Sequence, residues 1–600
     1  MNSLQKYSVN QYLVNTLLTY VQTGEIAIPE IQRPFVWSPA KVRDLIDSLY
    51  RGFPVGYIVT WQSPTVRLKD GSSSSNKKIL IDGQQRVTAL AAAILGQTVK
   101  NADYEDIRIK IAFNPLEKKF EVSNSVIEKN AAWIPDIAPL LSGEAKPSRV
   151  RKEYCERNPD VDEDELDEIL ESLRDVTKKQ IGVIELAGDL DIDSVTDIFI
   201  RINSQGVPLS QADFVMSKIA ANTAYGGHLL RKCIDHFCHL SQKPEFFEKL
   251  RTNDEEFAAS EYFGQMAWRR HELEDLYAPN YVDMLRVVFT YKFSRGKIGD
   301  LVGLLSGRNF QTREYETAIE EETYRKLREG LLEFINETNF KRFLMVVRSA
   351  GFCDKWMIRS RSALNFSYIV FLKLRSLKVP PEQIEKYVRK WLVMSILTAR
   401  YSGSAETQFE QDIKQIGDGD FESYLRDQEK ARLSDAFWNE GLVQELNASS
   451  TTHAYMSVFF ASQCKMNKRG FLSSSITVKD LIEQKGDIHH IFPRKYLIEN
   501  GKTRGQYNQL ANYVYAQTEV NIQIGKKPPE EYLGYMLGSQ CSGAPCKFGG
   551  IVDRGDFEKN LEENCIPLEA CSMGIGDYEE FLQKRRVLMA ARLKEYYQSL

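Results

Sequence analysis

The spacing of apolar residues changes repeatedly between strand and helix periods over the first 220 residues. From Asn10 to Gln22, apolar side chains recur every three or four positions, which predicts an amphipathic helix. A second helix is expected to begin at Ser38-Pro39, because serine caps helices and proline fits the first helical position, and to end near Gly52. The remaining patterns predict strands at 55–61, 78–81, 107–113 and 181–186, and helices at 87–95, 163–176 and 195–202.

The rest of the chain divides into a helical part and a mixed part. Residues 225–454 show helical spacing throughout, whereas residues 455–600 predict a short strand pair, loops and a long final helix from Tyr578. A chain of 600 residues is too long for one ordinary core. We therefore expect a multidomain α+β protein with an α/β domain at 1–224, a helical connector at 225–454 and a third domain at 455–600.

The composition and charge of the chain argue against several classes of protein. Hydrophobic content is 43% and charged content is 27%, as in globular proteins, and no apolar run is long enough to span a membrane. The N-terminus lacks the pattern of a signal peptide, so a cytoplasmic location is expected. The net charge of -4 excludes a wholly basic DNA coat but permits a local basic face. Nine cysteines, an odd count, argue against a disulfide framework.

A predicted strand runs into Asp82-Gly83-Gln84-Gln85-Arg86, and a helix follows directly. Free N–H groups at a helix start favour phosphate, a glycine permits close approach, and an arginine can bind phosphate oxygens with two nitrogens. Gln84 and Gln85 could hydrogen-bond a base, a ribose or an attacking water. On local sequence alone, an ordinary capped helix with polar surface residues is an equal alternative.

Two further segments place polar residues in unusual surroundings. Gln32 and Arg33 lie among the apolar residues of 28–37, where a charged side chain needs a partner. Arg201 and Asn203 precede a glycine turn in 199–210, and Asp213 lies just beyond.

Three stretches, IPEIQRPFVW, IDGQQRVTAL and IFIRINSQGVPLSQADF, follow in this order between residues 28 and 214. Together they resemble the ParB-like N-terminal domain of GmrSD-type, modification-dependent restriction enzymes. In that family the domain binds and hydrolyses nucleoside triphosphate, although this chain has no P-loop motif. The resemblance implies a nucleotide site formed by Asp82, Gly83, Gln84, Gln85 and Arg86, with Arg33, Arg201 and Asn203 as neighbours.

A second motif lies in the C-terminal part. Asp487-Ile488-His489-His490-Ile491-Phe492-Pro493 holds two of the seven histidines, Asn512 follows His490 by 22 residues, and Asn521 follows nine residues later. A neutral imidazole is a suitable base for activating water. A structural histidine pair with asparagines in turns is the alternative.

The stretches DIHHIFPRKYL and NQLANYVYAQTEVNIQIGKKPPEEYL resemble the HNH nuclease motif of the ββα-metal fold, and the C-terminal domain of GmrSD-type proteins. The resemblance implies that His490 is the general base, that His489 and Asn521 bind a divalent metal, and that Asn512 braces the loop. Asp487 shares a strand face with His489 and is a further candidate ligand. Because imidazole stands at His489 where HNH nucleases commonly have an acid, Mn or Ni could serve as well as Mg.

Other clusters have simpler interpretations. Two groups of residues could bind zinc, but buried thiols are the favoured interpretation of both. The basic residues of the final helix indicate either a solvated helix face or a phosphate-binding surface. The first zinc candidate is Cys541, Cys546, Cys565 and Cys571; the second is Cys233, His236, Cys238 and His239; the basic residues are Lys584, Arg585, Arg586, Arg592 and Lys594.

The combined hypothesis is a cytoplasmic, nucleoside triphosphate-regulated and metal-dependent DNA endonuclease. Its expected substrate is phage DNA carrying modified bases such as glucosylated or hydroxymethylated cytosine. The alternatives are a phosphorothioate-sensing NTPase and nickase, an RNA-cutting toxin, and a non-enzymatic nucleotide-switched DNA clamp. A homodimer is left open, and no membrane partner is expected.

Overall fold

The computed structural model describes most of the chain. The described residues are all except 1–4, 28–34, 36, 63–77, 101–105, 189, 191–194, 196–197, 199–210, 223, 272–275, 419 and 451–452. The chain forms two compact units, the first from Met1–Arg231 with Val302–Glu321, the second from Lys232–Leu301 with Glu322–Leu600. The predicted domain boundary at 224/225 lies close to Arg231, where the first and longer segment of the first unit ends. The two sides of the predicted boundary at 454/455 belong to the same unit.

The strands form one larger sheet and three strand pairs. The larger sheet has the order β1-β9-β3-β4-β2, and the pairs are β5-β6, β7-β8 and β10-β11. The strands are β1 (Tyr7–Leu13), β2 (Ile26–Ala27), β3 (Ile58–Gln62), β4 (Lys78–Asp82), β5 (Thr98–Lys100), β6 (Asp106–Arg108), β7 (Ile111–Asn114), β8 (Lys119–Val122), β9 (Gln180–Leu186), β10 (Ile488–His490) and β11 (Tyr513–Tyr515).

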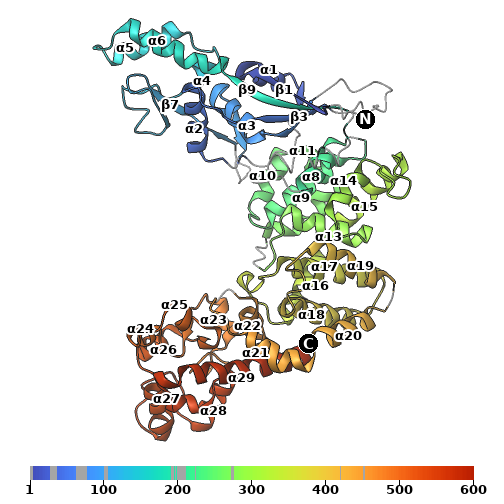
Figure 1. Ribbon diagram of the computed structural model, residues 1–600, viewed down its shortest axis with the longest axis vertical. Coiled ribbons are helices and arrows are strands. Elements are labelled where there is room, and N and C mark those ends of the chain that lie inside the picture. Colours follow the sequence, from blue (N-terminus) through green and yellow to red (C-terminus); the bar gives the residue numbers. More distant parts are fainter. Residues whose placement is uncertain are drawn as a thin grey trace. The chain divides into compact units, whose positions relative to one another are not determined.

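Helices make up most of the remaining described residues (Figure 1). The first are α1 (Val14–Gln22), α2 (Pro39–Tyr50), α3 (Gln84–Ile94), α4 (Ala138–Leu141), α5 (Pro147–Arg157), α6 (Glu163–Arg174), α8 (Gln211–Ala221) and α9 (Gly227–Leu240). The next are α10 (Phe246–Asn253), α11 (Glu255–Ala258), α12 (Glu261–Gln265), α13 (Tyr281–Phe293), α14 (Ile298–Leu305), α15 (Thr317–Ile335), α16 (Glu337–Ser349), α17 (Arg361–Ser376), α18 (Pro381–Leu397), α19 (Ala405–Asp418), α20 (Phe421–Arg432), α21 (Leu442–Glu445) and α22 (Ala454–Lys465). The last are α23 (Val478–Glu483), α24 (Arg494–Glu499), α25 (Arg504–Tyr507), α26 (Thr518–Ile524), α27 (Pro529–Gly538), α28 (Arg554–Glu563) and α29 (Tyr578–Gln598).

Short helical turns of the 3-10 and π types complete the secondary structure. A π-helical turn covers Phe437–Gly441, and the 3-10 helices cover Asp175–Lys178, Ala267–His271, Lys355–Met357, Leu510–Asn512, Gln540–Ser542, Leu568–Ser572 and Ile575–Asp577.

The sheet of the first unit is mixed, and its pairing corrects part of the sequence prediction. Strand β9 pairs antiparallel with β1 and parallel with β3, and β4 pairs antiparallel with β3 and parallel with β2. Asn10 to Leu13, predicted as helix, are strand, because the whole of β1 pairs with β9. The helix begins only at Val14. The predicted strand 107–113 is likewise divided, since β6 pairs with β5 and β7 pairs with β8.

One hydrophobic core joins this sheet to its helices. Helix α2 begins as predicted, with the Ser38 hydroxyl accepting from the backbone N–H of Lys41 and Pro39 in the first position. Helices α1, α2, α3 and α6 bury apolar faces together with strand residues such as Leu80 and Val183. This packing fixes the point at which β4 ends and α3 begins.

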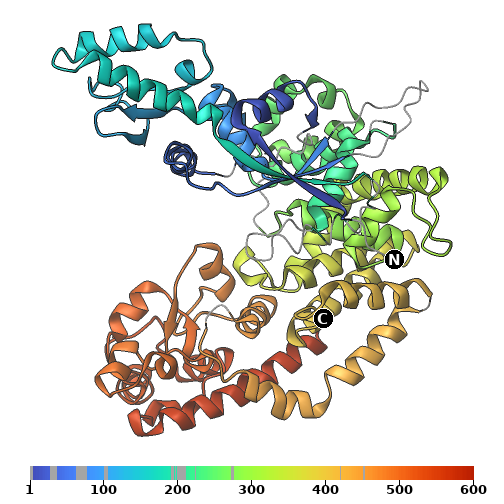
Figure 2. The same cartoon turned by 45° about the horizontal axis from the view of Figure 1, so that its top comes forward.

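The second unit is mainly helical, as predicted for residues 225–454. Helices α17 and α18 pack together and bury most of their side chains, including the fully buried Trp391. The final helix begins at Tyr578 as predicted and packs along α21 and α22 (Figures 1 and 2).

In the described part of the chain, the cysteines and helices do not indicate a disulfide, a metal-binding group or a membrane span. All nine cysteines are free thiols. Within the described ranges, no three His, Cys, Asp or Glu side chains gather as a metal-binding group, and the two cysteine-containing clusters do not form one. The same ranges contain no helix that is both long and apolar enough to cross a membrane.

Candidate nucleotide and nuclease sites

The junction between β4 and α3 brings the Asp-Gly-Gln-Gln-Arg motif to a helix start. Asp82 ends the strand, and Gly83 precedes α3 with a φ of 95°. A side chain at Gly83 would place its Cβ 3.0 Å from Cγ1 of Ile58. Both the positive φ and the close approach to β3 therefore require glycine here.

Asp82 and Arg86 form an ion pair across the first turn of α3. The Nη2 atom of Arg86 lies 3.3 Å from Oδ2 of Asp82, and Nη1 donates to the backbone carbonyl of Tyr57. A Cβ at Gly56 would lie 2.9 Å from Nη1, so the glycine leaves room for the guanidinium. Arg86 is thus held against the turn that leads into β3, with its side chain about one-quarter exposed (23%).

The start of α3 retains the features of an anion site. Within the described part of the chain, no side chain caps this helix and no acidic residue lies in its first turn. Its first backbone N–H groups and its dipole therefore favour an anion. Gln84 and Gln85 are partly exposed in the same turn. Arg33, Arg201 and Asn203 lie outside the described residues, while Asp213 is buried in α8.

His489 and His490 lie on β10, which pairs with β11, and helix α26 follows β11 in the chain. Strands β10 and β11 are antiparallel, with His489 opposite Val514 and His490 opposite Tyr513. Helix α26 begins three residues after β11 and carries Asn521. The order of these three elements is strand, strand, helix.

His490 is surrounded by aromatic and polar side chains. Its Nε2 atom is 3.1 Å from Oδ1 of Asn508, and its ring centroid is 4.9 Å from that of Tyr513 and 6.4 Å from that of Tyr507. Burial lowers the pKa of His490; the hydrogen bond to Asn508 opposes this shift and the charge of Arg494 adds to it. The imidazole is therefore neutral near pH 7, as a proton acceptor must be.

Asn508 is a functional candidate that the sequence did not single out. It lies four residues before Asn512, in a loop whose polar residues have no periodic pattern. Only the fold brings its amide to the ring of His490.

His489 and Asn521 have unused polar atoms. The Nε2 atom of His489 is buried and has no hydrogen-bond partner. Burial lowers the pKa of His489, against the opposing effects of Asp487 and a hydrogen bond to the Ala516 backbone. Asn521 is partly exposed, and its side chain makes no hydrogen bond within the described residues. A buried nitrogen without a partner is costly, so Nε2 of His489 is available to a metal cation. The amide oxygen of Asn521 is a second donor of suitable chemistry.

Asn512 is fully buried and ties three segments together. Its Oδ1 accepts from the backbone N–H of Phe492 at 2.8 Å, and its Nδ2 donates to the carbonyls of Phe492 and Tyr507. The backbone N–H of Ile491 also donates to the carbonyl of Asn512. These hydrogen bonds brace the end of β10.

The final helix, α29, contacts the loop that carries Asn512. Arg585 is fully buried and donates to the carbonyls of Ala511 and Asn564, at 2.9 and 3.1 Å. Arg586 and Arg592 are also buried. For these three arginines burial corrects both sequence interpretations of the basic helix, because buried arginines are neither a solvated face nor a phosphate-binding surface. Lys584 and Lys594 are partly exposed and pair with Glu580 and Asp435.

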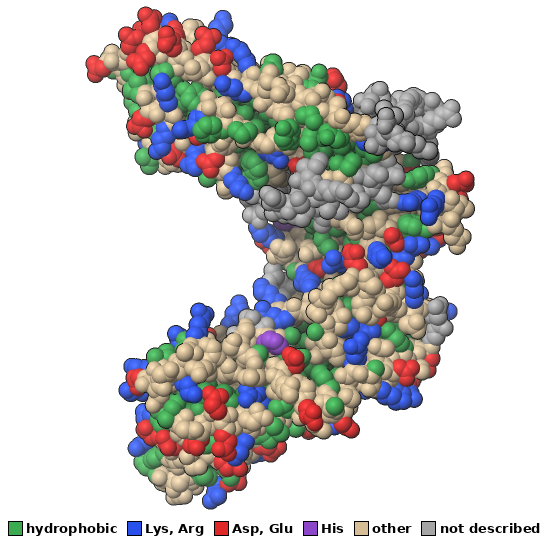
Figure 3. Space-filling model, in the orientation of Figure 1, with side chains coloured by type: hydrophobic (Ala, Val, Ile, Leu, Met, Phe, Trp, Pro, Cys, Tyr) green, Lys and Arg blue, Asp and Glu red, His purple; other side chains and the backbone are tan. Residues whose placement is uncertain are grey.

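Cations instead gather over the part of the chain that holds α24 and α25 (Figure 3). Arg494, Lys495 and Arg504 are exposed there. Lys502 pairs with Glu579, and Lys526 pairs with Glu499.

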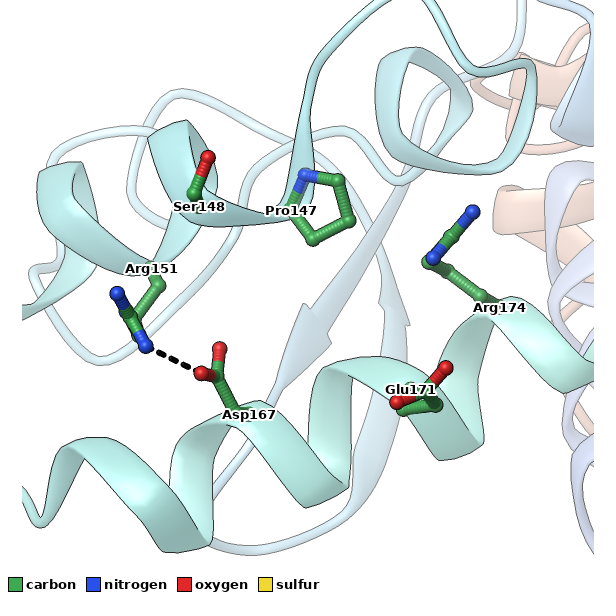
Figure 4. Close-up of a pocket in the computed structure, with 6 residues that line it drawn as sticks. All are labelled: Pro147, Ser148, Arg151, Asp167, Glu171 and Arg174. Carbon is green, nitrogen blue, oxygen red and sulfur yellow. Dashed lines mark hydrogen bonds and ion pairs between the residues drawn. The ribbon is translucent and has the colours of Figure 1, made fainter.

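A pocket of about 230 Å³ lies between α5 and α6 in the first unit (Figure 4). An ion pair between Arg151 and Asp167 crosses it, and Arg174 and Glu171 line it further along α6. None of the site residues predicted from the sequence lines this pocket.

Two comparisons with known proteins bear on this chain, a family match at its N-terminal part and a relative that aligns with most of its length. Residues 14–220 match the family described as GmrSD restriction endonuclease, N-terminal domain. The N-terminal region is thus similar to that of GmrSD-type restriction endonucleases, which agrees with the sequence-based resemblance. An uncharacterized protein of Methanocaldococcus jannaschii is 22% identical over 570 residues, covering 86% of this chain and 85% of that protein.

Proposed function

We propose that the protein is a metal-dependent DNA endonuclease that cleaves or nicks modified phage DNA under the control of a nucleoside triphosphate. The family match over residues 14–220 supports a role in restriction, and thus DNA as partner. The nuclease assignment rests on one observation, the strand pair β10-β11 followed by α26, with a partly buried His490 at the end of β10.

In this proposal, His490 takes a proton from the attacking water. Its lowered pKa keeps the ring neutral, and Asn508 fixes the ring through Nε2. If Asn508 accepts the hydrogen bond, the proton resides on Nε2 and Nδ1 is the basic atom. Asn512 keeps the end of β10 in place.

His489 and Asn521 would hold the divalent cation, with Asp487 as a further candidate. When bound, the cation would supply positive charge to the scissile phosphate and the leaving oxygen. The imidazole of His489 suits Mn or Ni, and the amide oxygen of Asn521 suits Mg, so all three metals are candidates.

The nucleotide would bind at the start of α3. Its phosphates would meet the backbone N–H groups of the first turn. In the structure Arg86 forms an ion pair with Asp82. If Arg86 binds a phosphate, the phosphate replaces Asp82 as its partner. The freed Asp82 carboxylate could then orient a water or a metal.

The test is cleavage of glucosylated, hydroxymethylated, phosphorothioated and unmodified DNA by the purified protein, with and without triphosphate and with each metal. Metal-dependent cutting of base-modified DNA is expected, and His490→Ala should remove it. Cutting of total RNA alone would indicate the toxin, and preference for phosphorothioate would indicate the nickase. Triphosphate-dependent DNA binding without any cutting would indicate a clamp.

A further inference from the structure

Two exposed arginines begin the two short helices that lie between the strand of His490 and β11. Arg494 is the first residue of α24, and Arg504 is the first residue of α25. Both are exposed. Neither guanidinium forms an ion pair or a hydrogen bond within the described ranges, whereas nearby Lys502 and Lys526 each pair with a glutamate.

An aromatic ring lies between Arg494 and His490, and Arg504 begins the helix that carries the same ring. The guanidinium carbon of Arg494 lies 5.3 Å from the ring centroid of Tyr507, which is itself 6.4 Å from that of His490. The ring of Tyr513 lies 4.9 Å from that of His490. Arg504 lies three residues before Tyr507 in the short helix α25, so the two side chains leave the same face of that turn. Burial raises the pKa of Tyr513 to about 12, and the charge of Arg504 opposes that shift.

The elements that carry the arginines are held in place. Thr503 and Gln506 form a capping box at the start of α25, and the hydroxyl of Tyr578 donates to the carbonyl of Gln506 at 2.9 Å. Pro493 precedes α24 immediately after the segment that Asn512 braces. Both arginines therefore project from backbone that is held in place, and neither has an acidic partner within the described residues.

We propose that Arg494 and Arg504 form a clamp that binds the DNA backbone on the two sides of the phosphate that faces His490. An unpaired guanidinium is suited to a phosphate, because it offers several donors in one plane. The two arginines are on different helices, so they can contact different phosphates of one strand. This inference rests on the proposed nuclease function and names the residues that hold its substrate.

The experiment uses the whole 600-residue chain with His490→Ala, so that DNA is bound and not cut. Binding of a fluorescent DNA duplex is measured by anisotropy over a range of salt concentrations for Arg494→Gln, Arg504→Gln and the double variant. Each lost phosphate contact should reduce the slope of log K against log salt by about 0.9, so the double variant should lose roughly 2. Affinity at low salt should fall about tenfold for each arginine.

Arg432→Gln is the matched control, since Arg432 is an exposed arginine at the end of α20. Its slope should equal that of the parent protein. All variants should keep the parent's thermal unfolding temperature, because neither clamp arginine is buried. If the double variant keeps the parent's slope of log K against log salt, Arg494 and Arg504 do not bind the DNA backbone. The nuclease proposal would still stand if the wild-type protein cuts DNA. If the wild-type protein neither binds nor cuts DNA, both proposals are wrong.

Discussion

At the scale of single residues, the candidate nuclease site is defined by which polar atoms have partners. Asn512 uses its side-chain oxygen and nitrogen on the backbone, and His490 is held by Asn508. Nε2 of His489 has no partner. Residues with satisfied atoms position the loop, and residues with free atoms are available to a metal, water or phosphate.

The first prediction concerns the proposed base. His490→Ala should reduce DNA cleavage by about 10²–10⁴-fold, because the variant has no group to accept the proton. Nucleotide hydrolysis should persist, since Asp82 and Arg86 belong to the other compact unit. Both rates are measured on the same preparation. His453→Ala is the control, because His453 caps α22 and stacks on Tyr455. Cleavage by His490→Ala at the control's rate would remove the base assignment.

The second prediction concerns Asn508. Asn508→Ala should lower kcat for cleavage roughly fivefold to tenfold, the value of one hydrogen bond, and leave DNA affinity unchanged. Asn508→Asp should restore most of the rate, because a carboxylate accepts the same hydrogen bond from Nε2. Single-turnover cleavage and DNA binding are measured for both variants. Equal losses in the two variants would show that Asn508 acts through packing.

The third prediction concerns Arg86. Arg86→Ala should weaken triphosphate binding by about 1.5–3 kcal/mol, because it removes a charge-assisted phosphate contact. Asp82→Ala should reduce hydrolysis more than binding. Isothermal titration and phosphate release are measured for both variants. Unchanged titration curves would remove the nucleotide site from the start of α3.

At the scale of elements, buried polar networks fix how helices pack. Arg400 follows α18 and makes two hydrogen bonds to Asp412 of α19, at 2.9 and 2.6 Å. Asp412 is fully buried and also accepts from the hydroxyls of Tyr401 and Tyr424. Each donor and acceptor is satisfied, so the network specifies one packing of α18, α19 and α20.

The fourth prediction tests this network. Asp412→Ala should lower the free energy of unfolding by about 3–5 kcal/mol, because Arg400 would be left as a buried charge without a partner. The measurement is chemical denaturation. Glu558→Gln, which breaks the exposed Arg554–Glu558 pair on α28, should cost less than about 1 kcal/mol. A loss for Asp412→Ala as small as that control would contradict the buried ion pair.

At the scale of the whole molecule, the two candidate sites belong to separate compact units. The residues of the nucleotide site lie in the first unit, and those of the nuclease site lie in the second. A nuclease that is active without control would cut the DNA of its own host. A nucleotide-dependent equilibrium between two arrangements would make cutting conditional.

The fifth prediction concerns coupling between the units. Triphosphate should change the rate of DNA cleavage, and modified DNA should change the rate of triphosphate hydrolysis. Linkage requires that the two binding affinities change by the same factor, whereas the rates need not. Each rate is measured with and without the other ligand, with unmodified duplex as the control. If neither rate responds, the units act independently.

The sequence alone determined the local features of this protein. Ser38 and Pro39 mark a helix start, Gly83 marks the turn between β4 and α3, and the spacing of apolar residues predicts α29. These features depend on neighbours within a few residues, because capping, backbone freedom and helical periodicity are local properties. The order of motifs between residues 28 and 214 also indicated the family that matches residues 14–220.

Only the tertiary structure decided which residues meet. Asn10 to Leu13 are strand because β9 pairs with them, although their spacing suits a helix. Arg585 is buried and Arg494 is exposed, although both are arginines in helices with a similar polar content. Asn508 reaches His490 across 18 residues of chain. Strand pairing, burial and long-range hydrogen bonds depend on partners that are distant in sequence, and no local pattern records those partners.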